Sequence, residues 1–380
     1  MLRRHFMLSV AGSAVGMLVL PKVAFAEAGT IDWYTNSDTN ILDFWTNTVA
    51  PKFEVANPGL KLNIVDAGDG MDAITQRALA ALETKTDPKA DFIEQGDPLS
   101  PKGAMEAGLY ANLKDSLSNW SKVNPLGIET DFAVPYRGSQ VLLAFDGTKV
   151  TPEDAPKTFE DLVKWIKANP GQFIYNRPDK GGSGGNFVRR VIHEVNGRDP
   201  SKFTVENFTP EYAEKMLAPA WELLKDLAPS LFEGGAYTGG NTPSIQLLSQ
   251  SAVTMIPAWS DMALQNIANG VLPETTGITQ LTDLAFCGGF ARSVVFANGA
   301  NRDAAIKLAD FVLTEEIQSA IISELGGFPG VAWDYVSADL RQKYQAVVPS
   351  SIPTFPGGDW GSAINDGWYR NVAPNVDRNA

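Results

Sequence analysis

The amino-acid sequence predicts an α/β fold, because short apolar runs of strand length alternate along the chain with amphipathic segments of helical period. The chain has 380 residues, and at roughly 150 residues per domain this length indicates two domains. Hydrophobic residues make up 44% and charged residues 20% of the chain, as in folded proteins rather than disordered ones. We therefore expect two globular units with mostly parallel strands.

Five segments carry the pattern of a strand. A polar turn follows the first, and the second alternates apolar with polar residues. The third is broken by Gln95-Gly96-Asp97-Pro98, and the fourth is a continuous apolar run of the length of a buried strand. The expected strands cover residues 31–34, 62–64, 91–94, 141–145 and 251–258.

Helical segments lie between these strands. Pro51 interrupts the first of them and should kink or restart it. Thr158 with Asp161 three residues later is close to a capping box, and Thr314 followed by two acids indicates another helix start. The apolar stripes of these helices contain Ile41, Phe44, Trp45 and Val49; Met71, Ile74, Ala78 and Leu82; Phe159, Leu162, Val163 and Ile166; and Ile317, Ala320, Ile321 and Leu325.

The N-terminal residues have the order of a secretion signal. Arg3 and Arg4 form a positive region, residues 6–20 form an apolar run, and Ala24-Phe25-Ala26 forms a small-x-small cleavage site. We expect cleavage directly after this site, so that residues 1–26 are a signal peptide and the mature protein is periplasmic. The two arginines also fit the twin-arginine export route, so this route and general secretion both stay open.

The net charge and the cysteine content of the sequence limit the kinds of partner that the protein can have. The formal net charge is -13, and removal of three basic residues with the signal peptide leaves 28 basic and 44 acidic residues. Such an acidic protein is an unfavourable partner for nucleic acid. Cys287 is the only cysteine in the sequence, so it forms no internal disulfide and no lipid-bearing cysteine stands at the expected new N-terminus. We expect a monomer that is free in the periplasm.

Residues for nucleophilic or metal catalysis are scarce. After cleavage His193 is the only histidine, and the sequence has no Gly-x-Ser-x-Gly elbow. We interpret His193 and Cys287 as structural residues, and a zinc site would lack its usual ligands. We expect no metal, no cofactor and no enzymatic activity. A secreted hydrolase stays open as a competing class, because the separation of two catalytic carboxylates depends on the fold.

Three segments resemble the extracellular solute-binding proteins of ATP-driven importers. The first ends in Asn57-Pro58-Gly59, as the family's early helix does before its second strand. The second is similar to the strand that leads to a tryptophan in the ligand cleft, here Trp259, and the third ends in a similar turn, Gly326-Gly327-Phe328-Pro329-Gly330. The likeness is to the branch that includes thiamine, polyamine and ferric-ion binders. The segments are residues 49–61, 251–259 and 308–330.

The resemblance implies two lobes, each a sheet flanked by helices, with the ligand between them and a hinge that closes them. We expect the first lobe to hold residues 27–134 and 290–325, and the second to hold residues 135–289 and 326–380. The implied function is the substrate-binding component of an ATP-binding-cassette importer, with a small-molecule ligand and a membrane permease as partners. A binding protein that feeds a sensor stays open.

The expected ligand-binding residues are aromatic or polar and lie beside strand ends or glycine-rich turns. Ligands of open α/β sheets bind outside the carboxyl ends of the strands. The glycine-rich loop 181–186 precedes a helix and offers backbone N–H groups. The expected residues are Trp33, Asn36, Asp38, Asp69, Asp97, Tyr136, Ser183, Asn186, Tyr237, Trp259, Asp261 and Arg292.

Two ligand classes fit this set of residues. A sugar, a polyol or a similar hydroxylated compound would be held by carboxylates and amides with aromatic stacking, and it is our first choice because the set mixes Asn, Asp, Arg and Trp. A cation such as a polyamine or thiamine would be held by aromatic rings and acids, and it is the alternative.

Processing of the N-terminus is directly testable. We expect N-terminal sequencing of the periplasmic protein to begin at or within a few residues of Glu27, because the cleavage site directly precedes this residue. Full-length protein found in the cytoplasm alone would contradict export.

Overall fold

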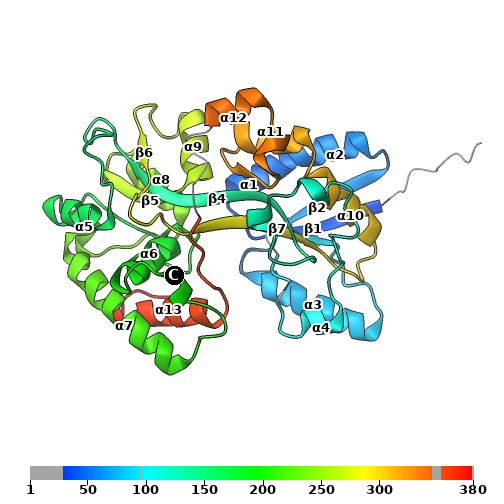
Figure 1. Ribbon diagram of the computed structural model, residues 1–380, viewed down its shortest axis with the longest axis horizontal. Helices are drawn as coiled ribbons and strands as arrows, with labels where there is room; N and C mark the ends of the chain where they lie inside the picture. The colour runs from blue at the N-terminus through cyan, green and yellow to red at the C-terminus, as the bar shows by residue number, and fades with distance from the viewer. Residues whose placement is uncertain (1–28, 95, 99, 345–351, 379–380) are drawn as a thin grey trace, which may run out of the picture.

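The computed structural model describes residues 29–94, 96–98, 100–344 and 352–378. They form two lobes that lie side by side and are joined by two long strands (Figure 1). These strands are β4 (Val134–Phe145) and β7 (Gly288–Val295). The predicted arrangement of two α/β lobes is therefore present, and the expected signal peptide lies outside the described residues.

The first lobe is built on three parallel strands. In β1 (Gly29–Thr35), Trp33 pairs with Ile64 of β2 (Leu60–Asp66) on one side and with Phe92 of β3 (Phe92–Ile93) on the other. The first three predicted strands are therefore confirmed, although their ends differ. The helices of this lobe are α1 (Thr39–Phe44), α2 (Ala50–Ala56), α3 (Met71–Thr84), α4 (Ala104–Ala107), α10 (Arg302–Phe311), α11 (Glu315–Ser323) and α12 (Ala338–Tyr344).

Pro51 alters its helix without ending it. A π-helical turn, Trp45–Val49, joins α1 to α2, so that helical backbone runs without a break from Thr39 to Ala56. Proline has no N–H to donate to the carbonyl four residues before it. The expected kink or restart thus takes the form of a wider turn directly ahead of the proline.

The strand β4 belongs to both lobes. It pairs antiparallel with β7, and the register shifts between Pro135 and Arg137. The order of hydrogen-bonded strands is β2-β1-β3-β7-β4-β5, where β5 is Met255–Trp259. Two short strands, β6 (Gly277–Thr279) and β8 (Phe328–Pro329), also pair with β4. All residues of β4 are buried. Its middle residues therefore lie where the two lobes meet (Figure 1).

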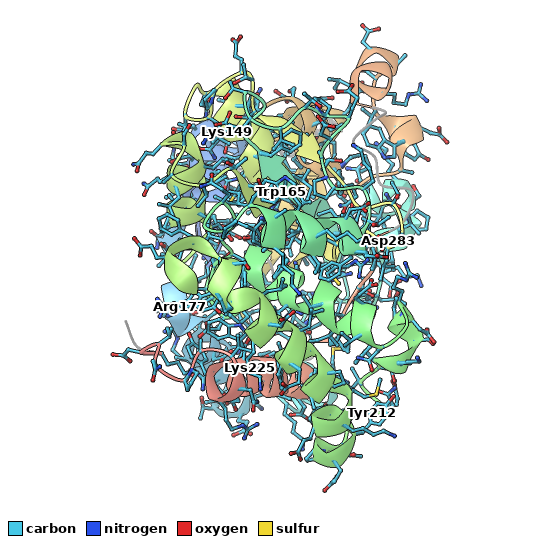
Figure 2. All side chains as sticks on the ribbon, turned by 90° about the vertical axis from the view of Figure 1, so that its left-hand side faces the viewer. Lys149, Trp165, Arg177, Tyr212, Lys225 and Asp283 are labelled. Carbon is cyan, nitrogen blue, oxygen red and sulfur yellow. The ribbon has the colours of Figure 1, made fainter. Side chains whose placement is uncertain are left out.

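The second lobe surrounds the other end of β4 with helices. Its aromatic core includes Phe187, whose ring contacts those of Phe173 and Tyr175. Figure 2 looks onto the outer face of this lobe, where Trp165 and Tyr212 are labelled on its outer helices. The elements of the lobe are α5 (Phe159–Ala168), α6 (Ser183–Val195), α7 (Pro210–Leu227), α8 (Asn241–Ser249), β5 (Met255–Trp259), α9 (Ser260–Ala268), β6 (Gly277–Thr279) and α13 (Asp359–Asn371).

Residues 326–344 lie with the first lobe, although we expected them in the second. Val331 and Val336 are buried in the first-lobe core. The physical reason is that Gln318 of α11 holds the returning chain: its side-chain oxygen accepts a hydrogen bond of 2.7 Å from the backbone N–H of Gly330. The chain after Leu325 therefore stays beside the first lobe instead of crossing.

The C-terminal helix α13 packs in the second lobe. Trp360 and Trp368 of α13 are buried in its core, and Trp368 Nε1 donates a hydrogen bond of 3.1 Å to the Tyr175 hydroxyl. Within the described residues, no helix has the length and apolar character needed to span a membrane.

The predicted capping box at the start of α5 is confirmed. Thr158 Oγ1 accepts a hydrogen bond of 3.1 Å from the backbone N–H of Asp161, and Asp161 Oδ2 accepts one of 3.1 Å from the backbone N–H of Thr158. By contrast, Thr314 precedes α11 without a side-chain cap.

Substitution Thr158→Ala should lower the free energy of unfolding by about 1 kcal/mol, because the backbone N–H of Asp161 loses its capping partner. Lys164→Ala on the same helix removes only an exposed ion pair with Glu160 and should cost under about 0.5 kcal/mol. Urea denaturation of both variants measures the difference. Equal losses of unfolding free energy in the two variants would argue against the Thr158 cap as the source of the stabilisation.

Candidate functional site

Polar side chains from both lobes meet around the middle of β4. Two series of contacts run between the lobes, and the backbone joins them at Ser37–Asp38 and at residues 259–261, so that together they form a loop that we call the interlobe ring. The ring consists of Ser37, Asp38, Glu94, Arg137, Gly181, Asn241, Trp259 and Asp261.

The first lobe contributes the end of β1 and the end of β3. Glu94 directly follows β3 and is fully buried, and its Oε2 accepts hydrogen bonds of 2.7 Å from both Thr35 Oγ1 and Ser37 Oγ. Since β1 and β3 are parallel neighbours, their carboxyl ends bring these groups to one edge of the sheet.

Arg137 of β4 connects the two lobes electrostatically. Its Nη2 lies 3.2 Å from Glu94 Oε1 in the first lobe, and its Nη1 lies 3.6 Å from Asp261 Oδ2 in the second. Its Nε donates a hydrogen bond of 2.7 Å to the Tyr136 hydroxyl, which in turn donates to Glu94. Arg137 is 7% exposed, so its charge depends on these two carboxylates.

The second lobe holds Asp261 in the first turn of α9. This carboxylate is 3% exposed, and its Oδ1 accepts a hydrogen bond of 2.6 Å from Ser139 Oγ. The N-terminal end of a helix favours a negative charge, and Asp261 lies there opposite the guanidinium of Arg137.

A second contact across the lobes joins Asp38 to Asn241. Asn241 Nδ2 donates a hydrogen bond of 2.7 Å to Asp38 Oδ2, and Asn241 Oδ1 lies 2.7 Å from Ser183 Oγ at the start of α6. Burial raises the pKa of Asp38, and the charge of nearby Asp261 raises it too. The hydrogen bond from Asn241 and the charge of Arg137 act in the opposite direction.

Trp259 closes the ring at the glycine-rich loop. Its indole Nε1 donates a hydrogen bond of 2.9 Å to the Gly181 carbonyl. Gly182 has φ 85° and would place a Cβ 3.0 Å from Trp259 Cζ2, so only glycine allows the loop to approach the ring this closely. The indole remains partly exposed at the end of β5.

Five of the sequence-predicted site residues lie in or directly against the interlobe ring. Asp38, Trp259 and Asp261 belong to it, and Tyr136 and Ser183 bind its members. Asn186 lies close by on α6, where its Oδ1 accepts a hydrogen bond of 2.8 Å from Arg189.

Other predicted site residues lie outside the ring. Trp33 is fully buried in the first-lobe core against Trp45, because its strand is covered by the helix that follows it. Tyr237 packs on Tyr175 and Trp368 in the second lobe. Trp33 is therefore corrected from a ligand contact to a core position, whereas Tyr237 is half-buried and stays a prediction.

The remaining predicted residues are engaged elsewhere or exposed. Arg292 Nε donates to the Gly127 carbonyl at 3.0 Å, and its Nη2 pairs with Glu129 at 2.5 Å. Asn36 and Asp97 are exposed and lie outside the helices and strands. Asp69 belongs to a short 3₁₀ turn, Gly68–Gly70, and its side chain lies outside the description.

Sequence reasoning missed Glu94, Arg137 and Asn241. Glu94 is the last residue of a predicted strand, where an acid is most often exposed. The polar residues 136–140, directly before the apolar run of β4, were the one available signal, since buried polar groups in a strand need partners.

The residues considered for catalysis are buried away from solvent. His193 packs between the rings of Phe203 and Phe355, and burial with the charge of Arg190 lowers its pKa to about 4. Cys287 is 2% exposed, and burial raises the pKa of its thiol to about 11. Within the described ranges, no group of three His, Cys, Asp or Glu side chains is arranged to hold a metal ion.

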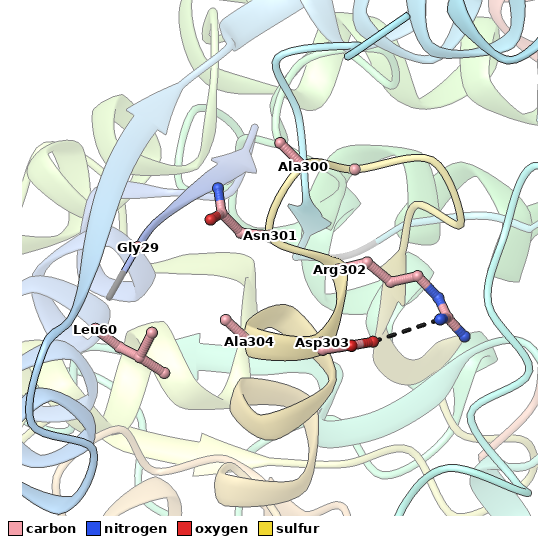
Figure 3. A pocket seen from close by; sticks show the side chains of 8 residues that line it. Gly29, Leu60, Ala300, Asn301, Arg302, Asp303 and Ala304 are labelled. Atoms are coloured by element: carbon pink, nitrogen blue, oxygen red, sulfur yellow. Dashed lines mark hydrogen bonds and ion pairs between the residues drawn. The ribbon is translucent and has the colours of Figure 1, made fainter. Parts of the chain in front are cut away.

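A separate surface hollow of about 370 Å³ lies on the first lobe at the start of α10 (Figure 3). The polar side chains that line it already have partners within the protein. The Asn301 side chain donates a hydrogen bond of 2.7 Å to the Thr30 carbonyl, and Arg302 forms an ion pair with Asp303. It lies apart from the interlobe ring, with which it shares no residue.

The sequence is similar to known binding proteins over most of its length. The profile of the bacterial extracellular solute-binding proteins matches residues 48–353. Protein YnjB of Escherichia coli (strain K12) is 26% identical over 334 residues, which cover 81% of this chain and 82% of that protein.

Solved structures share the fold. A periplasmic thiamin binding protein has a TM-score of 0.65 and 16% identity, covering 91% of this chain and 96% of its own. An ABC transporter substrate-binding protein from Bradyrhizobium japonicum USDA 110 has a TM-score of 0.67 and 16% identity, with 90% and 99% covered. The apo ferric ion-binding protein A of Pasteurella haemolytica has a TM-score of 0.63 and 12% identity, with 92% and 100% covered.

These likenesses confirm the predicted two-lobed fold. With a family profile that spans residues 48–353, the chain belongs to the bacterial extracellular solute-binding proteins.

Proposed function

We propose that this protein is the periplasmic substrate-binding component of an ABC importer and that it captures a small polar molecule at the interlobe ring. The observation that carries the proposal is that the ring takes its groups from both lobes. A ligand that contacts Asp38 on one side and Trp259 on the other binds best when the lobes are together, and so shifts the protein toward closure.

The strands β4 and β7 are the proposed hinge. They are the long elements that run from one lobe to the other, and the register shift beside Arg137 interrupts their ladder at the junction (Figure 1). Small changes of backbone angle there would separate the two halves of the ring. The closed form is the form that we propose docks on the membrane permease.

Two ligand classes are compatible with the ring. Carboxylates, an amide and an indole face suit a hydroxylated compound such as a sugar or polyol, which stays our first prediction. The same carboxylates and indole suit a cation. Proteins of similar fold are named for thiamin, ferric ion and GABA, so their names favour neither class.

We expect the bound molecule to be released chemically unchanged. The physical reason is that His193 and Cys287 are buried outside the ring, so that neither reaches a ligand held there. Calorimetry with a compound that binds should give one site per chain, and mass spectrometry after long incubation should recover the compound intact. Steady turnover would instead support the hydrolase alternative.

Substitution Trp259→Ala should weaken binding by about 1–3 kcal/mol, because it removes an aromatic face from the centre of the site. Trp165→Ala is the matched control, since this tryptophan lies on the outer helix α5 of the same lobe (Figure 2). Calorimetry measures affinity, and circular dichroism verifies the fold. Unchanged affinity in a folded Trp259→Ala variant would remove this residue from the site.

A further inference from the structure

The C-terminal helix α13 contacts the loop that leads into the second-lobe part of the interlobe ring. This loop, which we call the α6 loop, comprises residues 176–182 and runs from the core residue Tyr175 to the start of α6. It carries Gly181, whose carbonyl accepts hydrogen bonds from Trp259 Nε1 and from Asn241 Nδ2. The position of this carbonyl therefore decides how the second-lobe part of the ring is arranged.

The α6 loop is tied to the first turn of α6 by the buried side chain of Asn176. Its Oδ1 accepts hydrogen bonds of 2.6 Å from Ser183 Oγ and 2.7 Å from the backbone N–H of Gly184, and its Nδ2 donates to the Lys180 carbonyl. The backbone N–H of Lys180 donates a hydrogen bond of 3.0 Å to the Arg177 carbonyl. A shift of the outer residues of the loop is therefore passed on to the start of α6.

Two contacts from the C-terminal segment hold the outer side of the α6 loop. The Tyr369 hydroxyl donates a hydrogen bond of 2.9 Å to Asp179 Oδ1. Arg177 Nη1 donates a hydrogen bond of 2.9 Å to the Asp377 carbonyl. Arg177 is buried and Tyr369 and Asp179 are half-buried, so both bonds are partly shielded from water.

The helix α13 is itself fixed in the core of the second lobe. Trp368 is fully buried, and its Nε1 donates a hydrogen bond of 3.1 Å to the Tyr175 hydroxyl. A Cβ at Gly367 would lie 2.7 Å from Trp221 Cζ2 of α7, so glycine allows the two helices to approach this closely. The helix α13 therefore provides a rigid support for the α6 loop.

From these contacts we infer that Tyr369 is a positioning residue for the interlobe ring. Acting through Asp179, its hydroxyl sets the place of the Gly181 carbonyl, and this carbonyl in turn orients the Trp259 indole. The inference rests on the proposed function in taking the ring as the ligand site. It adds that a helix without any residue in the ring determines part of the geometry of that site.

The test is made on the protein without ligand. Its tryptophans are replaced by fluorotryptophan, and the fluorine resonance of Trp259 is assigned from its absence in Trp259→Phe. Hydrogen exchange is measured at the backbone N–H groups of Lys180, Ser183 and Gly184. In Tyr369→Phe we expect the Trp259 resonance to move and exchange at these three groups to rise about fivefold, as for the loss of one hydrogen bond.

Asp179 tests the same contact from its other side. Asp179→Asn retains an acceptor oxygen for the Tyr369 hydroxyl, so it should keep both signals at their wild-type values. Asp179→Ala should reproduce the effect of Tyr369→Phe, and the double variant should show no larger effect than either single variant, because the two residues act through one bond.

Tyr212→Phe is the matched control, because the Tyr212 hydroxyl donates to the Lys202 carbonyl at 3.3 Å elsewhere in the same lobe. It should leave both signals unchanged. A folded Tyr369→Phe variant with the wild-type Trp259 resonance and exchange rates would overturn the inference, as would equal changes in Asp179→Asn and Asp179→Ala. Either result leaves the proposed function standing, since that function is tested by ligand binding and these signals are measured without ligand.

Discussion

The buried guanidinium of Arg137 is the constraint on which the junction of the two lobes depends. It lies on the strand that both lobes share, and its two carboxylate partners come from opposite lobes. A buried charge that loses one partner costs about 3–5 kcal/mol. Glu94 and Asp261 must therefore stay within reach of β4, and this requirement fixes how the end of β3 and the start of α9 face each other.

The rest of the ring follows from this arrangement. With α9 held at the junction, Trp259 directly before it lies over the loop at Gly182, where a side chain would not fit. The loop in turn brings Ser183 and α6 to Asn241, the residue that meets Asp38. The backbone conformation of Gly182 therefore helps to position the second-lobe loop whose neighbour, Asn241, contacts the first lobe.

The sequence was sufficient to predict those features of the structure that depend on the local pattern of residues. The capping box at Thr158 and the existence of the first three strands follow from the residue pattern along the chain. The ring itself depends on tertiary contacts: Asp38 and Asn241 are 203 positions apart. The same limit explains Trp33, whose position at a strand could not reveal that the next helix covers it.

The central claim is that a small molecule binds between the lobes at the interlobe ring. Hydrogen exchange of the backbone, measured with and without the tightest-binding compound of a small-molecule screen, tests it most directly. We expect added protection in segments of both lobes, at residues 35–38 and at residues 181–183 and 259–261. Protection confined to one lobe, or to the surface hollow beside α10, would contradict the account.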